Sequence, residues 1–110
     1  MADILGKKVV VTVDRKMGTY HPERKDILYE VNYGYVENVL AGDGEEQDAY
    51  ILGIDYPVER FEGIVTAIIH RINDNEDKWV VIPVNAVVSD EEILRKTNFQ
   101  EKFFKIRLIR

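Results

Sequence analysis

An acidic turn near the middle of the chain has the composition of a site for a hard cation. Residues 42–48 read Gly-Asp-Gly-Glu-Glu-Gln-Asp. If this loop curls at its two glycines, the oxygens of Asp43, Glu45 and Asp48 can converge on one point. Converging carboxylates repel each other, and a hard cation such as Mg²⁺ removes that cost. A solvated acidic surface turn is the alternative interpretation, because such turns are common on protein surfaces.

Two further motifs lie upstream of this turn. Asn-Tyr-Gly-Tyr occupies residues 32–35, and Val-Asp-Arg occupies residues 13–15. Together with the turn they resemble the soluble inorganic pyrophosphatases, in which a Tyr-Gly-Tyr-like motif precedes an Asp-Gly-Asp-Pro-x-Asp loop at fixed spacing. Tyr33 stands at the family's distance from Asp43, and Asp43, Gly44 and Asp48 match that loop. The resemblance covers roughly residues 9 to 83 of the chain.

The resemblance implies a role for each matching residue. Asp43 and Asp48 would bind the Mg²⁺ ions that activate the attacking water, with Mn²⁺ as the alternative metal. Glu45 would stand where the family has its general base, so Glu45 and Asp48 would be the catalytic residues. Arg15 and Tyr33 would contact phosphate oxygens of the substrate.

A second acidic cluster follows in the predicted hairpin at residues 73–78, which read Asn-Asp-Asn-Glu-Asp-Lys. This segment resembles the family's second acidic cluster, which ends in Asp-x-Lys, although its alignment needs a gap. The resemblance implies that Lys78 is a phosphate ligand and that Asp74 and Glu76 are metal ligands.

These assignments agree with the chemistry of phosphoanhydride hydrolysis. The reaction needs a water that is nucleophilic at neutral pH and neutralisation of the charge on both phosphoryl groups. Metal ions between the turn and the hairpin would meet the first need. Arg15 and Lys78, with the metals, would meet the second, since Arg offers a planar fork to phosphate and Lys a point charge.

The chain also departs from the family pattern, which leaves two alternatives to an inorganic pyrophosphatase. Its turn reads Asp-Gly-Glu-Glu, so the expected base is one methylene longer, and nothing before Lys7 matches the family's N-terminal Lys and Glu. The first alternative is a hydrolase that acts on another phosphoanhydride or phosphoester. The second is a non-catalytic module that binds metal and phosphate. His21, Arg24, His70 and Arg71 could replace missing basic groups, with a solvated histidine and a paired strand-end arginine as the ordinary readings.

The elements that would position these residues are mostly short strands separated by turns rich in Gly, Asp, Asn and Pro. Ser89 with Glu92 predicts a capping box that opens one short helix over about residues 90–98. Strands and helix together predict a mainly β fold, a small closed or partly closed β-barrel with one short C-terminal helix. The resemblance implies that this barrel is OB-like. The predicted strands cover residues 8–13, 27–36, 48–52, 61–72, 78–82 and about 104–108.

Length and composition narrow the class of protein. The 110 residues predict a single pyrophosphatase-like domain spanning 1–110. A net charge of −5 argues against a nucleic-acid partner. The absence of cysteine and of a long apolar run predicts a cytoplasmic protein without a membrane partner. We expect pyrophosphate or a related phosphorylated small molecule as the ligand, and a homo-oligomer is an open alternative to a monomer.

Overall fold

The structure, a computed structural model, describes residues 4–110 and contains a sheet of six strands and one α-helix within that range. The elements in chain order are β1 (Lys8–Arg15), β2 (Asn32–Leu40), β3 (Glu46–Ile51), β4 (Arg60–Arg71), β5 (Glu76–Ile82), α1 (Asp90–Glu101) and β6 (Ile106–Ile109).

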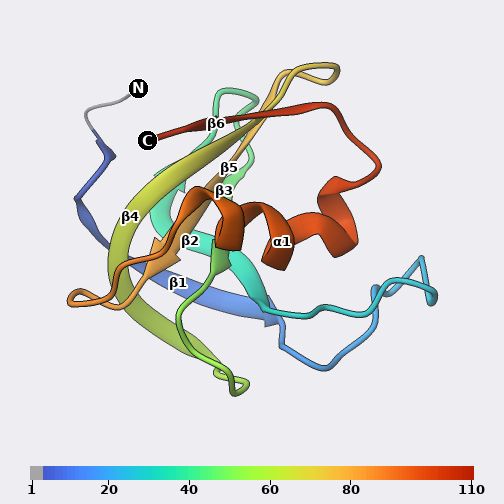
Figure 1. Cartoon of the computed structure of the whole chain (residues 1–110), viewed down its shortest axis with the longest axis horizontal. Helices are drawn as coiled ribbons and strands as arrows, with labels where there is room; N and C mark the ends of the chain where they lie inside the picture. The colour runs from blue at the N-terminus through green and yellow to red at the C-terminus, as the bar shows by residue number, and fades with distance from the viewer. Residues whose placement is uncertain (1–3) are drawn as a thin grey trace.

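The sheet closes into a barrel. Its strand order is β1-β2-β3-β5-β4-β6, and β1 also pairs with β4, so the first five strands form a closed ring and β6 extends the sheet from β4. β3 and β5 run parallel, whereas the other neighbours are antiparallel. In Figure 1, α1 lies across the middle of the view, and the loop between β1 and β2 extends to the lower right. The predicted small β-barrel with one short helix is therefore confirmed.

Two hydrophobic clusters form because side chains alternate between the two faces of each strand. One cluster draws on all five barrel strands, with Val11, Val36, Ile51, Ile68 and Val81 among its members, and fills the interior. The other lies on the outer face of β3, β4 and β5, where α1 and the segment before β2 cover the sheet. Residues in register with this second cluster therefore face the helix, and they include the candidate site residues Tyr33, Asp48 and Lys78.

Two backbone features shape the end of β1. The pairing of β1 with β2 shifts register between Val13 and Arg15, so Asp14 is the extra residue of a β-bulge. Because of this bulge, the consecutive residues Asp14 and Arg15 both line the same pocket. Gly34, opposite the bulge, must be glycine, since a Cβ there would lie 1.9 Å from the carbonyl oxygen of Thr12.

The predicted strand over residues 27–36 begins later, at Asn32. The residues before it belong to a loop with its own backbone pairing, in which the Tyr29 N–H donates to the Thr19 oxygen at 2.8 Å and the Gly18 N–H donates to the Tyr29 oxygen at 2.9 Å. Tyr29 and Val31 are buried against the helix-side cluster rather than in the barrel wall. Their apolar alternation produced the strand prediction.

The helix was predicted at the right place and three residues too short, as it runs to Glu101. Its N-terminal cap is confirmed, because the Ser89 hydroxyl accepts a hydrogen bond from the Glu92 N–H at 3.1 Å. Within residues 4–110 no helix is both long enough and apolar enough to cross a membrane.

Candidate active site

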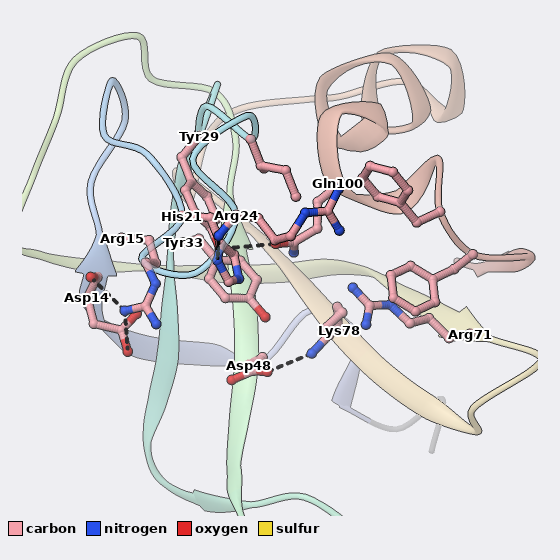
Figure 2. Close-up of a pocket in the computed structure, with 13 residues that line it drawn as sticks. Asp14, Arg15, His21, Arg24, Tyr29, Tyr33, Asp48, Arg71, Lys78 and Gln100 are labelled. Carbon is pink, nitrogen blue, oxygen red and sulfur yellow. Dashed lines mark hydrogen bonds and ion pairs between the residues drawn. The ribbon is translucent and has the colours of Figure 1, made fainter.

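A pocket of about 400 Å³ opens on the outer face of the barrel, between the loop that precedes β2 and the C-terminal end of α1. We call it the cationic pocket, since four Arg and Lys residues and two Asp residues are among those that line it. Figure 2 shows Arg15, Tyr33, Asp48 and Lys78 pointing into the same space. The full lining is Asp14, Arg15, His21, Arg24, Ile27, Tyr29, Tyr33, Asp48, Arg71, Lys78, Gln100, Phe103 and Phe104.

Lys78 forms the floor of this pocket together with two carboxylates. The parallel pairing of β3 with β5 brings Asp48 beside Lys78, and Nζ of Lys78 lies 2.6 Å from Oδ2 of Asp48 and 2.5 Å from Oε1 of Glu76. The lysine is only 3% exposed. A buried ammonium requires such partners, because an unpaired buried charge is strongly unfavourable. In this structure Lys78 therefore neutralises the two acids that the sequence assigned to metal.

Tyr33 borders the floor as a neutral hydroxyl. Burial, and next the negative charge of Asp48, raise the pKa of Tyr33 well above its ordinary value. Its ring packs against those of Tyr29 and Tyr50, with centroids 5.6 Å and 4.9 Å away. Tyr33 thus keeps its proton at neutral pH and can donate a hydrogen bond to an anionic ligand.

Arg15 stands at the mouth of the pocket beside Asp14. Its Nη1 donates to the carbonyl oxygen of Asp14 at 3.2 Å and lies 4.0 Å from Oδ2 of the same residue. Burial raises the pKa of the Asp14 carboxyl, and the positive charge of Arg15 acts in the opposite direction. A guanidinium has five N–H donors, so Arg15 keeps several that can bind phosphate oxygens.

A buried polar network fixes the end of α1 over the pocket. Arg71 forms two hydrogen bonds with Glu101, of 2.9 Å and 2.7 Å, and the Tyr50 hydroxyl donates to the same carboxylate at 2.5 Å. The Tyr29 hydroxyl donates to Gln100 at 3.0 Å, and the Gln100 amide donates to Tyr50 at 2.7 Å. Of the two readings of Arg71, the paired structural arginine is the one that the contacts show, although the side chain also lines the pocket.

A second hollow, of about 230 Å³, adjoins the first through Asp48. We call it the acidic hollow, because every lining residue but one carries a carboxylate: Ala41, Asp43, Glu45, Glu46, Asp48, Glu76 and Asp77. The buried Gln47 amide donates to the carbonyl oxygens of Asp48 and Asp77, at 3.0 Å and 2.9 Å, and so links the acidic turn to the hairpin. The predicted residues Asp43, Glu45, Asp48 and Glu76 thus share one surface.

The acidic hollow has the donor chemistry of a site for a hard cation, because carboxylate oxygens are the ligands that Mg²⁺ prefers. The donors are not gathered on one point, however. Across the described range 4–110, no three Asp, Glu, His or Cys side chains form a group that could hold one ion. The residues therefore fit a hard cation by their chemical type and by their location on one surface. Two of them, Asp48 and Glu76, are paired with Lys78 in this structure.

Asp74 lies outside both hollows. Its Oδ1 accepts a hydrogen bond from the Glu76 N–H at 3.2 Å, and its Oδ2 lies 3.8 Å from Nη1 of Arg71. It lines an adjoining depression together with Asp43 and Glu76, which also line the acidic hollow. The structure therefore places Asp74 near these two predicted ligands and not near Asp48.

Comparison with known proteins depends on structure alone, since no family model and no curated protein matches the sequence. The inorganic pyrophosphatase of Ehrlichia chaffeensis superposes with a TM-score of 0.72 at 15% identity, over 94% of this chain and 85% of that chain. The Thermus thermophilus enzyme gives 0.62 at 15% identity, over 94% and 81%. The Helicobacter pylori enzyme gives 0.61 at 15% identity, over 99% and 86%.

The fold is that of the inorganic pyrophosphatases. The predicted resemblance is thereby supported at the level of the backbone. Because the sequence identity is only 15%, this similarity shows the fold and assigns no role to individual side chains.

Several pocket residues had no clear signal in the sequence. Gln100 lies at the end of a helix that was predicted two residues too short to include it. His21 was read as a solvated loop histidine, but the loop folds back and brings both His21 and Arg24 to the pocket. Nδ1 of His21 accepts hydrogen bonds from the Glu23 and Arg24 N–H groups at 3.0 Å and 3.1 Å, so the neutral ring carries its proton on Nε2. The length of the segment between Arg15 and β2 was the sequence feature that could have indicated that His21 and Arg24 reach the pocket.

Proposed function

We propose that this protein is a Mg²⁺-dependent hydrolase that splits inorganic pyrophosphate into two phosphates. One observation supports this most directly: the cationic pocket and the acidic hollow meet at Asp48. A diphosphate bound at that junction would have basic and hydroxyl donors on one side and carboxylates able to hold metal on the other. The pyrophosphatase fold supports the same reaction class.

The pocket residues bind the phosphoryl groups. Arg15 provides a guanidinium fork at the mouth, and Tyr33 provides a neutral hydroxyl donor deeper inside. Lys78 lies on the floor as a positive charge, held in place by Asp48 and Glu76. These three groups neutralise and orient a substrate that carries several negative charges, which is the main requirement for phosphoryl transfer.

Asp43, Asp48 and Glu76 would hold Mg²⁺ at the acidic hollow, with Asp74 as the further ligand that the resemblance implies. The ion would supply charge neutralisation and a water of lowered pKa. Mn²⁺ is the alternative metal. Lys78 is paired with Asp48 and Glu76. A metal ion therefore binds to these two carboxylates only in competition with the ammonium group of Lys78.

Glu45 accepts the proton in the hydrolytic step. It lies exposed in the turn and lines the acidic hollow next to Asp48. The water oxygen forms a bond to one phosphorus as the bond from that phosphorus to the bridging oxygen breaks. The water proton passes to Glu45, and the second phosphate leaves with the bridging oxygen.

A second candidate function is a non-catalytic module that binds phosphate. The pairing of Lys78 with both Asp48 and Glu76 favours it, since the acids are already neutralised without metal. Isothermal titration with pyrophosphate separates the two functions. A binding module takes up pyrophosphate and releases no phosphate.

The test of the proposed function is phosphate release from pyrophosphate with Mg²⁺ and then with Mn²⁺. Wild type is compared with Asp48→Asn and with the control Asp55→Asn, which changes an acid of the β3–β4 loop that lines neither hollow. We expect Asp48→Asn to lose at least about 10²-fold in kcat, because the carboxylate joins both halves of the site. Equal turnover in the two variants, or no turnover in folded wild type, would reject the proposal.

A further inference from the structure

The rim of the cationic pocket has a chemistry that inorganic pyrophosphate cannot use. Phe103 and Phe104 form part of the lining, and Phe103 is 47% exposed at the mouth. The guanidinium carbon of Arg24 lies 5.0 Å from the centre of the Phe103 ring, and Nζ of Lys102 lies 5.4 Å from it. The mouth therefore combines an accessible aromatic ring with the guanidinium of Arg24, which is paired with Asp26, while Lys102 lies outside the lining of the pocket.

Both sides of this rim are held by interactions of their own. On one side, the backbone N–H of His21 donates to the backbone oxygen of Ile27 at 2.9 Å. This hydrogen bond closes the loop that carries Arg24. On the other side, the Arg71–Glu101 pair anchors the end of α1, and the Phe104 ring lies 3.7 Å from the Arg71 guanidinium carbon. Such fixed walls lower the entropic cost of ordering a bound ligand.

The size of the pocket also agrees with a ligand larger than inorganic pyrophosphate. Sites for small organic molecules typically enclose about 300–1,000 Å³ and are lined by apolar and aromatic groups with a few polar ones. At about 400 Å³ the cationic pocket falls in that range. Inorganic pyrophosphate consists only of phosphorus and oxygen and would use the basic floor alone. The aromatic rim then has no ligand group to contact.

We propose that the substrate class of this site extends to organic diphosphates whose organic group carries a planar ring, of the nucleoside diphosphate type. This inference rests on the proposed function, because the same floor and acidic hollow act on the terminal phosphoanhydride. The ring lies at the rim against Phe103 and Arg24, where aromatic and guanidinium planes both stack well on heterocycles. Figure 2 shows Arg24 on the loop side of the pocket and Gln100 on the helix side, above the floor formed by Asp48 and Lys78.

The reaction remains a hydrolysis by one water. The water oxygen bonds to the terminal phosphorus, and the bond from this phosphorus to the bridging oxygen breaks. The bridging oxygen leaves with the organic monophosphate. The products are one nucleoside monophosphate and one inorganic phosphate, and the water proton is released through Glu45 to solvent.

The test measures kcat/KM for adenosine diphosphate and for inorganic pyrophosphate in wild type, Phe103→Ala and the control Tyr56→Ala. Tyr56 is 56% exposed and does not line the pocket. We expect adenosine diphosphate to be hydrolysed by wild type. The ratio of its kcat/KM to that of pyrophosphate should fall about 10-fold in Phe103→Ala and stay constant in Tyr56→Ala.

A binding measurement keeps this inference separate from the proposed function. Calorimetry compares the non-hydrolysable methylene analogues of adenosine diphosphate and of pyrophosphate. Tighter binding of the adenosine analogue, weakened in Phe103→Ala, supports the inference. Pyrophosphate turnover without hydrolysis or preferential binding of the adenosine compounds would overturn the inference and leave the proposed function standing. No turnover of either substrate would overturn both.

Discussion

The cationic pocket and the acidic hollow share Asp48 but are stabilised in opposite ways. In the pocket, each buried charge has a partner: Lys78 has two carboxylates, and Arg71 has Glu101. The hollow gathers acids at the surface with no basic side chain in its lining. The pairing in the pocket is complete in the folded chain. In the hollow, Asp48 and Glu76 are paired with Lys78, whereas Asp43, Glu45 and Glu46 have no basic side chain beside them in the lining and would gain counter-charge from a bound cation. Charge pairing in the cationic pocket is thus a property of the fold, whereas part of the charge of the acidic hollow has no basic partner in the lining.

The largest effect is expected from breaking the walls of the pocket. Glu101→Gln leaves the buried Arg71 with only the more distant carboxylate of Asp74, and loss of one member of a buried pair typically costs about 3–5 kcal/mol. Urea unfolding followed by circular dichroism measures this change in the free energy of unfolding. The matched control is Glu91→Gln, an exposed acid of the same helix, which should cost less than about 1 kcal/mol. Similar losses in both variants would show that the pair does not hold the helix.

Removal of the shared ammonium should affect the two regions in opposite directions. Lys78→Met is expected to lower kcat/KM for pyrophosphate by about 10²–10³-fold, because a charge that stabilises the phosphoryl groups is lost. The same change frees Asp48 and Glu76, so Mg²⁺ affinity should rise. Calorimetry with MgCl₂ gives this second value, and Lys8→Met, at the exposed start of β1, is the control. A fall in both quantities would contradict the competition between lysine and metal.

A third variant tests the hollow alone. Glu45→Gln should lower kcat by about 10²-fold with little change in KM, because the amide cannot accept the proton that the attacking water releases. Glu46→Gln changes the next residue, which also lines the hollow, and should leave kcat within a few-fold. Steady-state assays of both variants at several pH values provide the comparison. Equal losses would assign the effect to charge in general rather than to a base.

The smallest effect is expected at Asp14, a pocket residue whose carboxylate is partly buried at a cost in stability. Burial raises its pKa above the ordinary 3.8, so ionisation of this acid is less favourable in the folded chain than in the unfolded one. The resulting penalty is absent below pH 3.8 and grows as the pH rises through the folded pKa. Asp14→Asn should therefore be slightly more stable than wild type at pH 7, by less than about 1 kcal/mol because the side chain is half exposed. Thermal unfolding from pH 3 to pH 7 should show the difference appear.

The sequence predicted the barrel well because strand signals and turn signals agree along most of the chain. The run 61–72 differs from β4 by one residue at each end. The exception is Ile27, Tyr29 and Val31, whose alternation is that of a strand although they pack from a loop onto the helix-side cluster. Periodicity reports which residues are buried but not which element covers them.

The grouping of the candidate site residues was predictable where it depends on local motifs. Arg15, Tyr33 and Lys78 line one pocket, as the resemblance implied, and Asp48 joins them through the parallel pairing of β3 with β5. Gln100, Phe103 and the hydrogen bonds of Tyr29 could not be predicted, because they arise where α1 meets a distant loop. Phe103 is exposed at the pocket mouth and not packed into the core.

The parallel pairing of β3 with β5 has a consequence for the order of folding. Antiparallel neighbours such as β1 and β2, or β4 and β5, can form early because only a loop or a turn separates them. The β3–β5 contact and the β1–β4 closure require most of the chain to be in place, and such non-local pairings form late. Asp48 and Lys78 meet only across that seam. A diphosphate that spans it should therefore slow unfolding and leave the folding rate nearly unchanged.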